Sequence, residues 1–170
     1  SRETIAGLSW SSALGILRVW EYTGRVRRGY FVEGLSGVQF IRDKDFQKTM
    51  LSLEHPEDKI SWLSAADPIQ VWGKSLAHLK DRAFICVPGT AVALCSGVPA
   101  AVFERQGQLL RVFDESRLDD VVHAFMCDFK ARRIFPSQNR VTVKKYPDSA
   151  AEVLSKAGFT REMRDYVLYR

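Results

Sequence analysis

The sequence has few of the residues from which small catalytic and metal sites are usually built. Its 170 residues include three cysteines and three histidines. The spacings of Cys86, Cys95 and Cys127 fit no zinc or redox motif, and an odd number argues against a secreted disulfide framework. The histidines share no cluster of ligands, and no G-x-S-x-G elbow is present. These absences disfavour a metalloenzyme or a serine hydrolase and predict reduced thiols in a cytoplasmic protein.

Long apolar runs and a complete nucleotide-binding motif are also lacking. No run approaches the roughly 18 apolar residues of a membrane span, and the opening Ser-Arg-Glu-Thr lacks the layout of a signal peptide. Structured-looking sequence begins almost at once, which indicates a fragment of something longer. Gly73-Lys74-Ser75 resembles the end of a phosphate-binding P-loop, but the glycine needed five residues earlier is Pro68. We therefore expect no membrane partner, no ATP site and no other cofactor in this chain.

Charge of one sign is only slightly in excess. The 25 lysines and arginines outnumber the 20 aspartates and glutamates, which gives a formal net charge of +5. This excess favours nucleic acid or another polyanion only modestly. An apolar content of 46% can bury the core of one good-sized domain or of two small ones.

Residues 1–53 have the pattern of the C-terminal half of a winged-helix module plus a connecting helix. Leu14, Leu17 and Trp20 keep the spacing of a buried helical stripe. The elements expected here are a helix ending at Gly24, strands at 25–32 and 38–41 around a glycine-rich turn, and a short amphipathic helix at 43–53. The wing of the module is then the hairpin formed by the two strands.

A polar linker at 54–61 separates this part from residues 62–170. Short apolar strands divided by turns at Pro88-Gly89, Ser96-Gly97 and Gln106-Gly107 predict a small antiparallel β-barrel or half-barrel. Helices are expected after Ser116 and Ser149, and strands at 140–146 and 166–169. The fold class is therefore α+β, a partial winged helix followed by a barrel-like domain flanked by helices.

Basic side chains supply the main candidate for a binding site. The predicted wing presents Arg25, Arg27, Arg28 and Tyr30, and the predicted strand at 140–146 adds Arg140, Lys144 and Lys145. Guanidinium groups match phosphate oxygens, and an exposed aromatic ring can stack on an unpaired base. Physical chemistry alone leaves a solvated hairpin and a nucleic-acid-binding wing about equally favoured.

Two other candidates have strong structural alternatives. Asp67 precedes Pro68, and an aspartate in this position more often initiates a turn than acts as a general base. Trp72 is the nearby aromatic side chain on which a base could stack. Gln106-Gly107-Gln108 could present two amides to a base, but the segment falls where a hairpin should turn, and the turn is the stronger interpretation.

The segment WEYTGRVRRGYFVEGLSGVQF carries a specific resemblance. It is similar to a pattern near the C-terminal end of the Lhr (large helicase-related) proteins, with thirteen matches at fixed spacing. The matching residues are Glu21, Gly24, Arg27, Arg28, Gly29, Tyr30, Phe31, Val32, Glu33, Leu35, Gly37, Gln39 and Phe40. A second block at 64–73, SAADPIQVWG, resembles the family's Ala-Ala-Asp-Pro-Ala-Asn-Pro-Tyr-Gly and departs from it at Gln70, Val71 and Trp72.

The resemblance implies a parent protein that is a superfamily 2 DNA helicase involved in DNA repair, with ATP and Mg²⁺ bound in a motor far upstream. This chain would be the last piece of a C-terminal region of winged helices ending in a β-barrel. That region resembles the AlkZ/YcaQ type of DNA glycosylase, whose catalytic glutamines have no counterpart at a matching position here. The expected location is the bacterial cytoplasm, in association with the nucleoid.

Three functions remain open on this basis. The first is a non-catalytic module that binds single-stranded or damaged DNA and packs against the upstream helicase and winged-helix domains. The second is a glycosylase in which Asp67 activates water and Trp72 stacks on the flipped base. The third is an oligomerisation or docking domain, whose arginines would meet carboxylates instead of phosphates.

Overall fold

The computed structural model describes residues 1–2, 5, 7 and 9–170, which fold as two compact units. The first unit consists of Ser1–Glu57 with Ser75–Ala77, and the second of Asp58–Lys74 with His78–Arg170. Each unit combines helices with antiparallel strands, which confirms the α+β class. Among the described residues, no helix is both long enough and apolar enough to cross a membrane.

The first unit opens with helix α1 (Trp10–Tyr22), and its apolar stripe is more exposed than the sequence predicts. Ala13 is the one buried residue of this helix, Trp20 is 39% exposed, and Leu14 and Leu17 are half-buried. The helical spacing was therefore recognised correctly, but burial of the whole stripe was wrong. A stripe is buried only where another element covers it, and the described part of this unit covers little of α1.

The wing forms as predicted, with shorter strands. Strand β1 (Val26–Gly29) pairs antiparallel with β2 (Gln39–Arg42), and helix α2 (Asp43–Glu54) follows directly. The buried Gln39 accepts hydrogen bonds at Oε1 from the backbone N–H groups of Phe31 and Val32, at 3.0 and 2.8 Å, and donates from Nε2 to the Val32 carbonyl at 2.8 Å. One side chain thus fixes the start of the wing loop on β2.

The second unit contains a four-stranded antiparallel meander. Its strands, in spatial order, are β3 (Ile60–Ser64), β4 (Ala91–Cys95), β5 (Val98–Glu104) and β6 (Leu109–Val112). The hairpins turn at Ser96-Gly97 and at 105–108, as predicted. The apolar run at 83–87, a candidate fourth strand, pairs with nothing in the described chain, and β3, which the sequence did not indicate, takes the edge of the sheet.

The predicted barrel is not closed. In the part of the chain that the structure describes, β3 and β6 are the two edges of an open sheet and do not pair with each other. Closure requires tilted strands with a regular stagger, and eight or so are typical of small closed barrels. Four strands of four to seven residues cannot meet that requirement. The half-barrel alternative is the nearer description.

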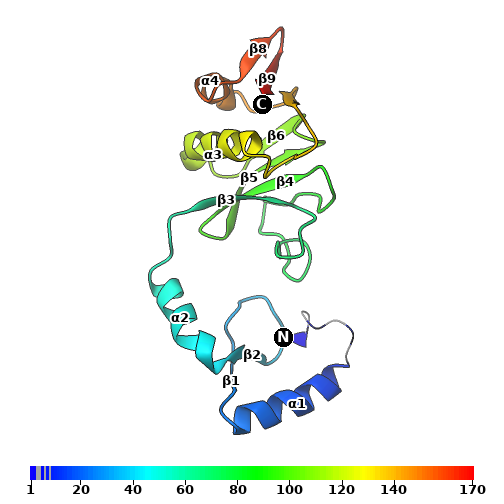
Figure 1. Ribbon diagram of the computed structural model, residues 1–170, viewed down its shortest axis with the longest axis vertical. Helices are drawn as coiled ribbons and strands as arrows, with labels where there is room; N and C mark the ends of the chain where they lie inside the picture. Colours follow the sequence, from blue (N-terminus) through cyan, green and yellow to red (C-terminus); the bar gives the residue numbers. More distant parts are fainter. Residues whose placement is uncertain (3–4, 6, 8) are drawn as a thin grey trace. The chain divides into compact units, whose positions relative to one another are not determined.

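Helix α3 (Leu118–Lys130) covers one face of this sheet after a short 3-10 turn, η2 (Glu115–Arg117) (Figure 1). The apolar face predicted for this helix is confirmed, because Leu118, Val121, Val122, Phe125 and Phe129 are all buried. On β3, Trp62 donates from Nε1 to the Val121 carbonyl at 2.9 Å and stacks on Phe103 of β5. The indole therefore joins helix and sheet in one core.

A second, three-stranded sheet lies at the far end of this unit from β3 (Figure 1). It consists of β7 (Arg140–Val143), β8 (Thr160–Glu162) and β9 (Asp165–Tyr169) in the order β7-β9-β8, with helix α4 (Ala150–Lys156) between β7 and β8 in the chain. The inner face carries the buried Val141, Val143, Tyr166 and Leu168. The predicted alternation on β7 is confirmed, since Arg140 faces outward and Thr142 is only partly buried.

Candidate nucleic-acid interface

The wing surface, defined as Arg25, Arg27, Arg28 and Tyr30, is displayed to solvent. Tyr30 is 82% exposed at the end of β1, and all three arginines are exposed. The Arg25 guanidinium lies 5.1 Å from the centroid of the Trp20 ring, a cation–π contact that orients it without neutralising it. The exposure that the sequence analysis expected for Tyr30 is therefore present.

Two of these arginines also form ion pairs within the unit. Arg27 Nε lies 2.6 Å from Asp43 Oδ1, and its guanidinium covers the Phe46 ring at 4.5 Å. Arg28 Nε lies 3.2 Å from Glu21 Oε1. The side chains of Arg27 and Arg28 nevertheless remain 49% and 60% exposed. Exposed pairs of this kind contribute about 0.2–1 kcal/mol, so a phosphate can compete for either guanidinium.

Asp67 lies in a hydrogen-bonded turn. Its Oδ1 accepts from the backbone N–H of Ile69 at 2.9 Å, the geometry of an Asx turn, and its carbonyl accepts from Lys74 Nζ at 2.6 Å. The neighbouring Gln70 is buried and donates to the carbonyls of Ala65 and Trp72. These contacts are the structural role that the sequence analysis weighed against general-base chemistry.

Trp72 is also held by structural contacts. Its Nε1 donates to the Gly97 carbonyl at 3.0 Å, and its half-buried ring packs against the small core cluster of Ala65, Phe84, Val92 and Val102. Neither Asp67 nor Trp72 lines the two cavities described next. The structure thus does not bring the predicted carboxylate and stacking ring to these concave surfaces.

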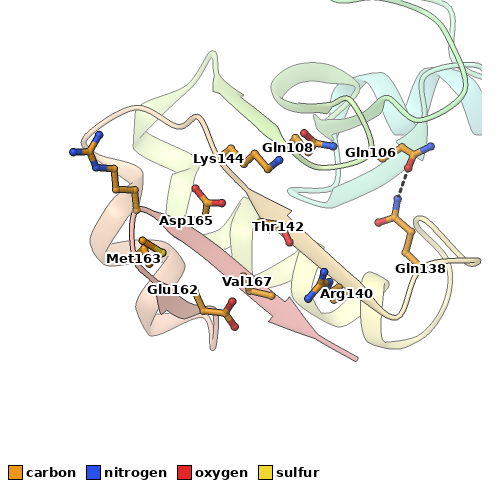
Figure 2. A pocket seen from close by; sticks show the side chains of 11 residues that line it. Gln106, Gln108, Gln138, Arg140, Thr142, Lys144, Glu162, Met163, Asp165 and Val167 are labelled. Atoms are coloured by element: carbon orange, nitrogen blue, oxygen red, sulfur yellow. Dashed lines mark hydrogen bonds between the residues drawn. The ribbon is translucent and has the colours of Figure 1, made fainter.

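A cavity of about 790 Å³ lies on the outer face of the three-stranded sheet. Figure 2 shows Thr142 and Val167 at its centre, Arg140 and Gln138 toward one end, and Lys144 and Asp165 toward the other. The full lining is Gln106, Gln108, Gln138, Arg140, Thr142, Lys144, Glu162, Met163, Arg164, Asp165 and Val167. Two of the predicted basic residues, Arg140 and Lys144, therefore share a concave surface with three glutamine amides.

The β5–β6 turn brings two of these glutamines to β7 because of Gly107. This glycine has a φ of +91°, and a β-carbon added to it would overlap Val141 Cγ1. The close approach lets the Gln108 carbonyl accept from the N–H groups of Lys144 and Lys145, at 2.9 and 3.1 Å. The segment 106–108 is thus a hairpin turn, as predicted, and it also lines the cavity, a role that the turn interpretation had set aside.

Gln138 completes the amide wall from a loop held by Arg170. The Arg170 guanidinium donates to the carbonyls of Phe129, Phe135 and Pro136 and lies over the Phe129 ring. Burial against this loop, together with nearby Arg132, lowers the pKa of Arg170 below its usual value. Gln138 Nε2 then donates to Gln106 Oε1 at 3.2 Å, which joins the loop to the turn (Figure 2).

An adjoining cavity of about 430 Å³ continues this surface, because the two share Lys144 and Arg164. It is lined by Lys144, Lys145, Tyr146, Asp148, Arg161 and Arg164. The predicted Lys145 lies here. Sequence reasoning missed Gln138, Thr142, Arg161 and Arg164 as site residues. They come from β7 and the loop before it and from β8 and the turn after it, which the pairing of β9 with both strands brings into one sheet.

The described residues include no group of three or more His, Cys, Asp or Glu side chains able to hold a metal ion. The geometry instead provides exposed cations, amides and aromatic rings. Groups of these kinds are the ones that contact anions and the polar edges of bases in nucleic-acid-binding proteins.

A helix followed by a two-stranded wing defines the first unit as a winged-helix domain. Residues 1–57, about a third of the chain, match the family model described as "Large helicase-related protein, winged-helix domain". A relative from Mycolicibacterium smegmatis, named "Lhr helicase/ probable uracil glycosylase", is 34% identical over 110 residues. That match covers 58% of this chain and 7% of the relative, so the chain spans a small part of the relative's length. The resemblance in the wing segment is confirmed.

Proposed function

We propose that this chain is a DNA-binding part of the C-terminal region of an Lhr-type helicase and does not itself carry the motor. The observation that supports this most directly is the wing surface, where three exposed arginines accompany an exposed tyrosine. In this proposal ATP and Mg²⁺ act in an upstream motor. The parent protein would work in DNA repair in the bacterial cytoplasm, close to the nucleoid.

The wing would bind DNA by exchanging carboxylates for phosphates. Arg27 leaves Asp43 and Arg28 leaves Glu21, both of which are weak exposed pairs, while Arg25 is already free of a carboxylate partner among the described residues. Each new phosphate contact releases counterions, so affinity should fall steeply with salt and depend little on sequence. Tyr30 adds a ring that can stack where bases are unpaired.

Replacing Arg25, Arg27 and Arg28 together by glutamate tests this proposal. We expect affinity for a short DNA duplex to fall by on the order of 10- to 100-fold at moderate salt, with a salt slope smaller by about 0.9 per lost contact. Gel-shift titration at several salt concentrations measures both quantities. The matched control reverses Arg18, Lys44 and Lys48, three exposed cations of the same unit outside the wing. Equal losses of affinity in both variants would mean that only the net charge matters, and would contradict the assignment of DNA binding to the wing.

Base excision is the second candidate function, because the mycobacterial relative carries that activity in its name. In this chain Asp67 would have to activate water through Oδ2, since its Oδ1 accepts from Ile69. Incubation with uracil-containing and lesion-bearing oligonucleotides, scored for abasic sites, tests the candidate. Product formation lost in Asp67→Asn would support it, and an inert chain would refute catalysis by this part of the protein.

A further inference from the structure

The outer face of the three-stranded sheet carries a row of cations beside one exposed aromatic ring. Antiparallel pairing places Arg140 opposite Tyr169 and Thr142 opposite Val167. Tyr169 is 50% exposed, and its hydroxyl donates to Glu162 Oε1 at 2.8 Å, which fixes the ring on this face. A basic row next to an exposed ring is how many proteins hold unpaired nucleic acid, with phosphates on the cations and a base on the ring.

The cations on this surface are free of carboxylate partners, unlike two of the three on the wing. The two adjoining cavities are lined by Arg140, Lys144, Lys145, Arg161 and Arg164, against Asp148, Glu162 and Asp165. Within the described chain, none of these five cations forms an ion pair. Arg140 and Lys144 are four residues apart in extended chain, or about 13 Å. The row is therefore long enough to meet more than one phosphate of a strand.

The glutamines distinguish a nucleic acid from a simple anion. Each amide offers both a donor and an acceptor, and the single bond between Gln138 and Gln106 leaves most of that capacity unused at the cavity. Amides of this kind match the hydrogen-bonding edges of bases, which are accessible only where bases are unpaired. A carboxylate-rich polypeptide would satisfy the cations but would leave the amides and the Tyr169 ring without matching groups.

We propose that this outer face binds an unpaired nucleic-acid strand, with its phosphates along the cation row, one base on Tyr169 and a base edge at the glutamines. The strand-binding face is defined by Gln106, Gln108, Gln138, Arg140, Thr142, Lys144, Val167 and Tyr169. This inference rests on the proposed DNA binding and gives it a second site, in the second unit, with a single strand as its ligand.

The base contact is tested with the full 170-residue chain and a fluorescein-labelled single-stranded DNA of mixed sequence. The same backbone with abasic positions serves as the matched probe. Fluorescence anisotropy should show the base-containing strand bound about tenfold more tightly than the abasic one. Tyr169→Ala should remove most of that difference, and Tyr169→Phe, which keeps the ring and loses the bond to Glu162, should retain most of it. The double variant Gln106→Ala, Gln108→Ala should narrow the difference without abolishing binding.

The phosphate contacts are tested separately. Arg140→Ala and Lys144→Ala should weaken binding of both probes and reduce the salt slope by about 0.7 each, the value for a single strand. Lys80→Ala is the control, because this lysine is also exposed, belongs to the same unit and lines neither cavity. All the substituted side chains are exposed, and far-ultraviolet circular dichroism verifies that each variant is folded.

The outcomes separate this inference from the proposed role of the wing. Loss of single-strand binding in the Arg140 and Lys144 variants, with the wing triple variant unaffected, supports the strand-binding face. Loss only in the wing triple variant overturns it and leaves the proposed function standing. Binding of the abasic strand as tight as that of the normal strand overturns the base contact, as does equally tight binding of polyglutamate. A chain that binds neither duplex nor single strand overturns both proposals.

Discussion

At the scale of single residues, Gln39 is a motif position whose structural role is visible only in the structure. The sequence marks it as one of thirteen matches to a family pattern, but only the structure shows its amide joined to Phe31 and Val32. Gly29 has a similar explanation, because a β-carbon at position 29 would lie only 2.8 Å from the edge of the Phe31 ring. Both residues shape the loop that presents Tyr30.

Replacing Gln39 by alanine should therefore loosen the wing loop. Three partly buried hydrogen bonds are lost and their backbone partners are left unpaired, so we expect the free energy of unfolding of the first unit to fall by about 1–3 kcal/mol. Hydrogen exchange of the Phe31 and Val32 amides should accelerate. Gln39→Glu keeps the acceptor but cannot donate to Val32, so its loss of stability should lie between those of the unchanged chain and Gln39→Ala. Gln47→Ala, an exposed glutamine on α2, should leave exchange unchanged. Unchanged protection in Gln39→Ala would contradict the role of this side chain.

At the scale of elements, the spacing of apolar residues predicted the helices, strands and turns, and the contacts between elements decided which of their faces are buried. The apolar face of α3, the alternation on β7 and the hairpin turns of the meander followed from local spacing. The apolar stripe of α1 is not buried as a whole, and the four-stranded sheet does not close into a barrel. Both depend on partner elements that local spacing cannot reveal. The larger cavity was not predicted from the sequence for the same reason, since its walls are a turn, a loop and a sheet that are distant in the chain.

The contact between the β5–β6 turn and β7 gives a prediction at this scale. Gly107→Ala should lower the stability of the second unit by more than the strain of an alanine at positive φ, because the new methyl group would also collide with Val141. We expect a loss of about 2–4 kcal/mol in the second unit, measured by thermal or denaturant unfolding. Gly97→Ala is the matched control. It has a similar φ of +85° with nothing within 4 Å, and should cost about 1 kcal/mol.

The double variant Gly107→Ala, Val141→Ala separates the two causes. Removing the valine methyl groups makes room for the added methyl group, so the two substitutions together should cost less than the sum of the single variants. Strict additivity would mean that the turn does not press on β7.

At the scale of the whole chain, the two units have cores of very different size. The main cluster of the second unit contains Trp62, Phe103, Phe125 and Phe129 among twenty buried residues. In the first unit, the buried residues among those described are Ala13, Val26 and Gln39. Stability rises with the apolar surface removed from water, so the first unit should unfold at a lower temperature than the second.

Calorimetry should therefore resolve two transitions. Val26→Ala should lower only the first midpoint and Val122→Ala only the second, because the two valines belong to separate cores. The near-ultraviolet signal of the buried Trp62 should disappear with the second transition. A single transition lowered by both variants would instead show that the units unfold together.

The walls of the larger cavity come from both sheets of the second unit, since the glutamine turn belongs to the meander and Arg140 and Val167 to the smaller sheet. Any occupant would therefore bridge them and have to be released before either could melt. By thermodynamic linkage, a saturating ligand that binds only this cavity should raise the melting temperature of the later transition in proportion to the logarithm of its concentration and leave that of the earlier transition unchanged. A melting curve would thus show which of the two units binds the ligand.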